Sequence, residues 1–333
     1  MSTPLDEDHD LVVEPSEAGR PVDAILRLRL GGTWGAVRGL IERGKVSVDG
    51  KRVTEPTVRL RAGAAIAVRP RARRIDASLL DDSGIAYVDP HVVVVRKPAG
   101  ISTIPYEPGE RGTLEEKTRL WLVKRQKQAP NASLGVVHRI DKETSGLVVF
   151  ARTFAAKKVL SQAFRVHAIE RRYVAIVHGV LEGKRTFKSY LVEHRGDGLR
   201  GTARDPRIGE RVGQLSITHV AGIDVLSRDV AGDGASLVAC ALETGRTHQI
   251  RIHLSEARFP LVGDRVYTRD RLRAERPLID APRLMLHAMV LGFEHPLSKK
   301  PLRFVEPLPA DIKAVAAKLA GRPIDVLPDA LPL

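Results

Sequence analysis

A short polar stretch enclosed between two apolar segments is the strongest constraint on how this chain can fold. Residues 138–147 read HRIDKETSGL, with GVV before them at 135–137 and VVFA after them at 148–151. The segment that follows has the length and the β-branched composition of a buried strand. Gly146 allows a tight backbone approach or a positive φ. We therefore expect a loop that holds one carboxylate, that of Asp141, at the floor of a cleft.

The charge of the chain indicates a polyanionic partner. Its 333 residues have room for one large domain and a small one. Lysine and arginine number 54 against 40 aspartates and glutamates, which gives a net charge of +14. This excess favours nucleic acid as the first candidate partner, and a solvated basic surface is the alternative.

Cysteine content and hydropathy exclude several classes of protein. Cys240 is the only cysteine, which rules out an internal disulfide and a thiolate zinc cluster. Because it lies in the apolar run 237–242, we expect a buried structural thiol. No apolar run approaches the length of a membrane span, and the amino terminus is acidic rather than signal-like. We therefore expect a cytoplasmic protein with no membrane contact.

The amino-terminal part divides into a tail, a small module and a linker. Residues 1–20 carry six acids and one arginine, which predicts a disordered or loosely packed tail. Residues 21–69 predict two helices, the second capped by Thr33, then a hairpin over 45–53 with an Asp-Gly turn and a strand over 64–68. Residues 70–80 form a basic linker. The apolar positions expected in the two helices are Val22, Ile25, Leu26, Leu28, Val37, Leu40 and Ile41.

A larger domain is expected over 81–322, followed by a Pro-rich tail over 323–333. Residues 250–254 fit either a strand or the start of a helix. In a helix capped by Thr113, we expect Leu114, Leu120 and Val123 to face inward. The other predicted elements are strands at 85–88, 92–95, 148–151, 173–177 and 236–243, and helices at 155–165 and 310–319.

Several motifs occur in an order that resembles one enzyme family. Besides the polar loop they are 97–100 (KPAG), 172–175 (RYVA), 244–253 (TGRTHQIRIH), 263–267 (GDRVY) and 286–288 (LHA). Together they resemble the RluA-type pseudouridine synthases, in which the aspartate of an HR(L/I)DxxTSG(L/V) motif does the chemistry. The small module at 21–69 resembles the αL-type RNA-binding module of ribosomal proteins and RNA-modifying enzymes. Six motifs in order are far more specific than any single short pattern.

The resemblance implies a fold and an activity. The fold is α+β, with a mixed, mostly antiparallel β-sheet flanked by helices around a central cleft, and a small α/β amino-terminal module. The activity is conversion of uridine to pseudouridine in large-subunit ribosomal RNA, by a monomer without metal or organic cofactor. The implied residues are Asp141, Tyr173 and Arg251 in catalysis; Arg139, Lys97, Thr144, His248 and Gln249 in substrate binding; and Arg38, Arg43, Lys45, Lys51 and Arg52 in contacts with RNA phosphates.

The reaction explains why one acid is enough. Breaking the glycosidic bond develops positive charge on the sugar, which a carboxylate stabilises, attacks or relieves by taking a proton. The uracil stays in the pocket, so no water needs activation. Desolvation opposes ionisation of Asp141, and the resemblance implies that the Arg251 guanidinium offsets this. It also implies that the Tyr173 ring packs on the target base, that Arg139 enters the RNA where this base has flipped out, and that His138 supports the site.

Two departures from the family pattern weaken parts of this interpretation. Thr33-Trp34 replaces the usual Ser-Arg, which loses a phosphate contact and offers a ring for base stacking. Residues 209–215 replace the usual GKxAxT pattern.

Alternative functions stay open at this point. The same chemistry could act on tRNA. A ribosome-assembly factor that binds RNA without modifying it would have lost one of the three catalytic residues, and all three are present. A protein kinase is excluded because Ile140 separates His-Arg from Asp and because the glycine-rich loop is missing. A metallohydrolase would need clustered ligands at metal spacing.

Overall fold

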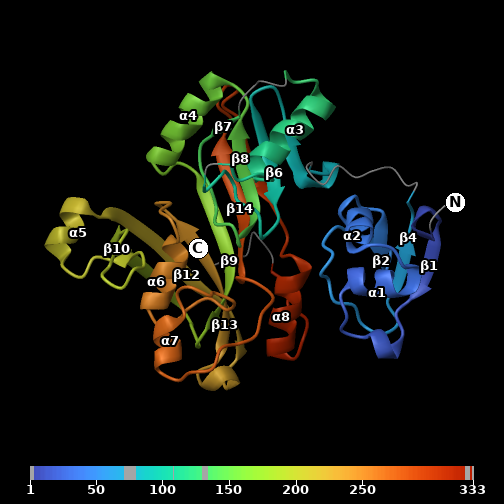
Figure 1. Cartoon of the computed structure of the whole chain (residues 1–333). Helices are drawn as coiled ribbons and strands as arrows, with labels where there is room; N and C mark the ends of the chain where they lie inside the picture. The colour runs from blue at the N-terminus through green and yellow to red at the C-terminus, as the bar shows by residue number, and fades with distance from the viewer. Residues whose placement is uncertain (1–3, 71–79, 108, 130–133, 327–330, 332–333) are drawn as a thin grey trace. The chain divides into compact units, whose positions relative to one another are not determined.

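A computed structural model of the chain describes residues 4–70, 80–107, 109–129, 134–326 and 331 (Figure 1). The chain divides into two compact units, Met1–Leu80 and Asp81–Leu333. Most of the linker expected over 70–80 lies outside the described residues. No helix in the described part of the chain is long and apolar enough to cross a membrane.

The smaller unit is a four-stranded antiparallel sheet that packs on two helices. The strands run in the order β1-β4-β2-β3, and the helices are joined by a short turn. Thr33 caps the second helix as expected, since its hydroxyl accepts the N–H of Ala36 at 3.2 Å. The elements are β1 (His9–Val12), α1 (Val22–Leu30), α2 (Trp34–Glu42), β2 (Val46–Val48), β3 (Lys51–Val53) and β4 (Ala65–Val68).

Most local predictions for this unit are confirmed. Six of the seven apolar helix positions are buried in one core, and only Leu28 is exposed. The hairpin turns at Asp49 and Gly50, both with positive φ, and the Asp49 carboxylate accepts the N–H of Ala65 at 2.9 Å. The Asp-Gly pair therefore sets the turn and ties it to the neighbouring strand.

The segment expected to be a disordered tail is ordered from residue 4 onward. Strand β1 pairs with β4, with His9 opposite Val68. Leu5 and Val13 are buried in the core. The acids are held by arginines: Arg29 donates to Glu17 at 2.7 Å. The acidic composition misled the prediction because the compensating bases lie elsewhere in the same module.

The larger unit contains a mixed, mostly antiparallel sheet, as predicted, and eleven strands of it lie in the described residues. Its order is β11-β10-β12-β13-β9-β14-β8-β6-β5, with β15 beside β14 and β7 beside β8. The pair β14 and β8 is parallel and every other pair is antiparallel. The strands are β5 (Ile85–Val88), β6 (Val92–Lys97), β7 (Gly135–Val136), β8 (Ser145–Ala151), β9 (Glu170–His178), β10 (Lys184–Val192), β11 (Gly201–Thr202), β12 (Gln214–Ser227), β13 (Ala235–Leu242), β14 (Leu286–Glu294) and β15 (Pro301–Val305).

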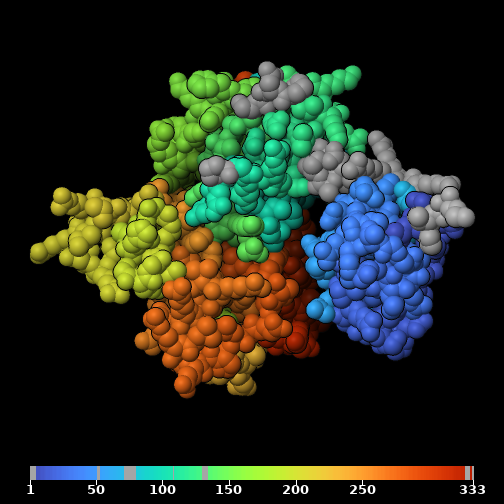
Figure 2. All heavy atoms as spheres, viewed as in Figure 1, coloured from blue at the N-terminus to red at the C-terminus, as the bar shows by residue number. Residues whose placement is uncertain are grey.

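Helices cover parts of this sheet. Helix α4 packs on β7 and β8, and α8 packs on β12 (Figure 1). The segment around β10 and α5, yellow in Figure 2, projects from the rest of this unit. The helices are α3 (Leu114–Gln126), α4 (Phe154–Arg165), α5 (Pro206–Val212), α6 (Gln249–Glu256), α7 (Arg269–Arg273) and α8 (Ala310–Ala320).

Two large hydrophobic clusters lie in the described part of the larger unit. One lies between α4 and strands β6 and β8. All seven residues of β8 are buried. The other joins β9, β13 and α8 with Ile324, Val326 and Leu331, so the described part of the Pro-rich end packs on the domain. Cys240 is fully buried, as expected, and burial raises the pKa of its thiol to about 12.

One detail differs from the sequence-based expectations, and one ambiguity is resolved. In α3 the buried side chains are Leu114, Thr118, Trp121 and Leu122, whereas Leu120 and Val123 are half-buried. On this face the Trp121 indole donates to Asp82 at 2.8 Å. The ambiguous segment 250–254 is helical.

Candidate functional site

The polar loop lies between β7 and β8, and its end is fixed by a close approach to β14. Gly146 has φ 120°, and a Cβ there would overlap the carbonyl oxygen of Ala288. Ser145 donates to or accepts from Nδ1 of His287 at 2.9 Å. The loop therefore ends at one fixed point on the sheet.

Lys97 and Thr103 hold the loop from the other side. Lys97 is only 2% exposed, and its Nζ donates to the carbonyls of Pro98, Lys142 and Thr144 at 3.0, 2.8 and 2.7 Å. Burial lowers the pKa of Lys97 to about 7. Thr103 bonds to both the N–H and the carbonyl of Ile140. Lys97, expected to bind substrate, instead ties the loop to β6 and lies outside the cavity linings.

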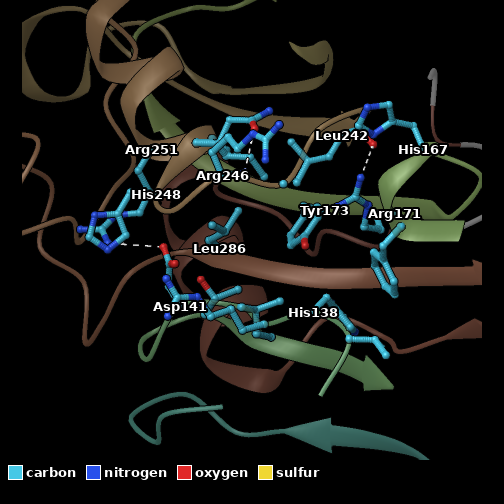
Figure 3. A pocket seen from close by; sticks show the side chains of 18 of the residues that line it. His138, Asp141, His167, Arg171, Tyr173, Leu242, Arg246, His248, Arg251 and Leu286 are labelled. Carbon is cyan, nitrogen blue, oxygen red and sulfur yellow. Dashed lines mark hydrogen bonds and ion pairs between the residues drawn. The ribbon is translucent and has the colours of Figure 1, made fainter. Parts of the chain in front are cut away.

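Asp141, Arg251 and Asp264 form a chain of charges. Arg251, on α6, donates through Nε and Nη2 to Asp264 at 2.7 and 3.0 Å. Its Nη1 points to Asp141 Oδ2 at 3.4 Å. Asp264 is fully buried and also accepts the N–H groups of Val266 and Tyr267. Asp264 thus fixes the guanidinium and leaves one edge for Asp141. Figure 3 shows Arg251 and Asp141 in the cavity.

The ionisation of this chain follows from its contacts. Burial alone would lower the pKa of Arg251, but the hydrogen bonds and charge of Asp264, with the charge of Asp141, raise it above its usual value. Burial alone would raise the pKa of Asp264, and Arg251 holds it below its usual value. Both groups are therefore charged at neutral pH.

Tyr173 lies on β9 and faces the same cavity. It is 7% exposed, and burial raises the pKa of its hydroxyl to about 12. No residue in the described part of the chain forms a hydrogen bond with this hydroxyl. The ring and its polar end are therefore available to a ligand.

The two histidines of the predicted site, His138 and His248, both make contacts within the protein. His138 accepts the N–H of Val149 through Nε2 at 3.1 Å, and its ring stacks on Phe164 at 4.5 Å. Burial lowers its pKa to about 3, so it is neutral. His248 meets the Tyr267 hydroxyl at 3.0 Å, and burial lowers its pKa as well.

Gln249 and Arg139 differ in whether their polar groups are available to a ligand. Gln249 donates to Ile217 O and Thr218 Oγ1 and accepts from Thr244 and Arg246, so its amide is used within the protein. Arg139 is exposed and donates to Thr247 Oγ1 at 3.0 Å. Thr144 is 1% exposed, and its buried hydroxyl has no hydrogen-bond partner in the part of the chain that the structure describes.

Two cavities meet at Asp141. One of 420 Å³ runs from Asp141 past Tyr173, and one of 560 Å³ lies on the side of Thr103 and Lys142. They share Arg139, Ile140, Asp141 and His248. In the described residues no three histidine, cysteine, aspartate or glutamate side chains gather as metal ligands.

The basic side chains of the smaller unit that were predicted to contact phosphates differ in how far they are engaged within the protein. Arg38 donates to the buried Asp23 at 2.8 Å and lies over the Trp34 ring at 5.3 Å, so this guanidinium is largely engaged. Arg43 and Lys45 are half-buried. Lys51 and Arg52 belong to β3, and their side chains lie outside what the structure describes.

The sequence analysis assigned no role to two residues that contribute to the site. Asp264 belongs to the GDRVY motif but received no role, and Arg171, which lines the first cavity, stands next to the RYVA motif. The motif order pointed to both segments, whereas the side chain that each residue contacts depends on the fold.

Comparison with known proteins supplies the family. Residues 91–256 match the family described as RNA pseudouridylate synthase, and residues 20–66 match the S4 domain. A ribosomal large subunit pseudouridine synthase D from Xanthomonas campestris is 33% identical, over 96% of this chain and 95% of the relative. One from Buchnera aphidicola is 30% identical, over 85% and 89%.

A solved structure agrees in fold. The human RNA pseudouridylate synthase domain containing 4 is 23% identical over 72% of this chain and 93% of its own, with a TM-score of 0.54. With the match over 91–256 and the near full-length relatives, the predicted family and the predicted RNA-binding module are both confirmed. The chain belongs to the RNA pseudouridylate synthase family and is an RNA pseudouridine synthase with an amino-terminal S4 domain.

Proposed function

We propose that this enzyme modifies uridines of large-subunit ribosomal RNA and that Asp141 is its catalytic carboxylate. The observation that carries the proposal is the ion pair between Asp141 and an Arg251 guanidinium held by Asp264, at the meeting point of two cavities. The names of the relatives from Xanthomonas campestris and Buchnera aphidicola support the choice of RNA.

The arrangement places the Asp141 carboxylate beside the Arg251 guanidinium, where the sugar of the target nucleotide would lie. A fixed guanidinium offsets the cost of removing a carboxylate from water. It does so without giving up a proton, because arginine keeps its charge. Attack on the sugar carbon and removal of the neighbouring proton both require this ionised carboxylate. Neither route uses a second acid, and Asp264 is engaged with Arg251.

Tyr173 and Arg139 would act on the flipped nucleotide. The Tyr173 ring offers a packing surface for uracil, and its raised pKa keeps the hydroxyl protonated at neutral pH, as a hydrogen-bond donor. Arg139 stands exposed at the border of both cavities, where it can fill the space that the target base leaves in the RNA. The S4 domain adds contacts to phosphates, which strengthen binding without reading sequence. Action on ribosomal RNA would place the enzyme in the cytoplasm.

The test maps pseudouridines in a strain that lacks the gene. Carbodiimide treatment and primer extension are applied to large-subunit ribosomal RNA and to tRNA. We expect specific stops in ribosomal RNA to disappear, to return with the wild-type gene and to stay absent with Asp141→Asn.

A matched control is Glu143→Gln, an exposed acid two residues along the same loop, which should restore the stops. Stops lost only from tRNA would contradict the proposed substrate. Stops restored by Asp141→Asn would contradict the proposed catalyst.

A further inference from the structure

Arg171 is a buried cation that the proposed chemistry does not use. It is 8% exposed, and its Nη2 donates to the carbonyls of Leu242 and Glu243 at 3.2 and 2.7 Å. Among the described residues, none accepts a hydrogen bond from its Nε. Its Nη1 packs on the backbone of Gly245, where any Cβ would overlap it. The guanidinium is therefore held in place with donor capacity left over.

No carboxylate balances this charge in the described part of the chain. The acids closest in sequence or contact pair with other bases: Glu170 with Arg303 at 3.0 Å, and Glu243 with His219 at 2.7 Å. Burial lowers the pKa of Arg171, yet a guanidinium keeps its proton at neutral pH. A buried cation without a counter-ion is costly, so an anionic ligand would stabilise it.

The surroundings of Arg171 favour an anion. It lies at the end of the 420 Å³ cavity away from Asp141, beyond Tyr173 (Figure 3). The exposed side chains of Arg165, His167 and Arg246 line the same cavity. Asp141 is the one acid among the described lining residues. The charged side chains at this end of the cavity are therefore arginines, with no acid among the described residues that line this end.

We propose that Arg171, together with Arg165 and Arg246, binds a phosphodiester of the RNA strand next to the nucleotide whose base lies beside Asp141. A uracil edge would accept a hydrogen bond from Nε but would leave the charges uncompensated. A phosphodiester supplies both the charge and several acceptors. The inference rests on the proposed position of the target base, and it assigns the strand a direction across the cavity from Asp141 toward Arg171.

The test neutralises single phosphates in a short RNA that contains a uridine modified by the wild-type enzyme. Each flanking linkage in turn becomes a methylphosphonate at a 2′-O-methyl nucleotide, with the matching 2′-O-methyl phosphodiester as its control. Single-turnover rates measured against enzyme concentration give a half-saturating concentration and a limiting rate. For the wild-type enzyme, we expect one linkage whose neutralisation raises the half-saturating concentration about tenfold or more, while the limiting rate stays within about threefold.

The variants show whether this linkage meets the basic cluster. In Arg171→Gln the same methylphosphonate should raise the half-saturating concentration by less than about twofold, because the contact is already lost. Arg165→Gln and Arg246→Gln should each reduce part of the methylphosphonate effect on the half-saturating concentration. Each should also lower the log–log slope of RNA binding against salt by about 0.7 unit. Arg207 is an exposed arginine on α5 outside the cavity lining. Its substitution Arg207→Gln should leave the full methylphosphonate effect in place.

Folding and alternative roles are separated by the same measurements. If circular dichroism shows that Arg171→Gln does not fold, the two exposed variants carry the test. Equal methylphosphonate penalties in the wild type and in all folded cluster variants would overturn the proposal. So would a fall in the limiting rate of Arg171→Gln with an altered pH profile and an unchanged half-saturating concentration, because Arg171 would then act through Tyr173. Failure of the Asp141 assignment would appear separately, as an active Asp141→Asn enzyme.

Discussion

Asp264→Asn is the change that most directly probes how the site is held together. Asp264 accepts two hydrogen bonds from Arg251 and two from backbone N–H groups, and its side chain has no exposed surface. Asparagine keeps the size but has one acceptor oxygen, and its amide N–H group would face the guanidinium. The buried Arg251 then loses its counter-charge and its orientation toward Asp141.

The expected loss is large. Removing one partner of a buried ion pair typically costs about 3–5 kcal/mol of unfolding free energy. We expect about 3–4 kcal/mol here, since the backbone N–H groups still find the remaining oxygen. For a domain of this size, that corresponds to a fall in Tm of about 6–16 °C. The single-turnover rate should fall about 10- to 100-fold, because a misplaced guanidinium no longer supports the Asp141 carboxylate.

The pH dependence gives a second signature. Arg251 holds the pKa of Asp264 below its usual value in the folded protein. A carboxylate with a depressed folded-state pKa stabilises the fold fully above its unfolded-state pKa of about 4, and this contribution is lost as the pH falls through the folded-state value. The difference in unfolding free energy between wild type and Asp264→Asn should therefore shrink as the pH falls below about 4.

Urea unfolding and a single-turnover assay measure these effects. The control is Asp270→Asn, whose side chain is 66% exposed and lies 3.6 Å from Arg273, so its removal should cost under about 0.5 kcal/mol. If Asp264→Asn matched this control in both stability and rate, the role given to Asp264 would be wrong.

Three further outcomes are expected. Lys97→Met removes all three donors to the loop carbonyls and should cost about 2–4 kcal/mol in urea unfolding, whereas an unchanged midpoint would contradict the tie to β6. A protein beginning at residue 81 should show a raised KM on RNA, a nearly unchanged kcat and a flatter salt dependence of binding, and unaltered binding would make the S4 domain structural only. Amide exchange should be slow in β1, because β1 pairs with β4. Rapid exchange there would support the sequence-based prediction of a disordered tail.

The sequence was enough to predict most elements and the residues around Asp141. The apolar run after HRIDKETSG and the Asp-Gly turn are local signals, and the structure has β8 and the hairpin where they were expected. Motif order pointed to Arg251, although 110 residues separate it from Asp141.

Other features depended on contacts distant in sequence. The acidic segment is ordered because β1 pairs with β4 and Leu5 and Val13 are buried, while Arg29 and Arg69 pair with its acids. Lys97 was expected to meet substrate because the family resemblance implied it; only the fold brings the carbonyls of Lys142 and Thr144 to its Nζ. Asp264 is hidden for the same reason, since its value to the site comes entirely from Arg251 on another element.

The measurement that tests the central claim is tritium release from RNA labelled at uridine C5, under single turnover, with wild type and Asp141→Asn at matched RNA occupancy. The substitution preserves side-chain size and leaves the ties of Lys97 and Thr103 to the loop intact. We expect RNA binding within about threefold of wild type and no detectable release. Release within about tenfold of the wild-type rate would contradict the assignment of Asp141 as the catalytic carboxylate.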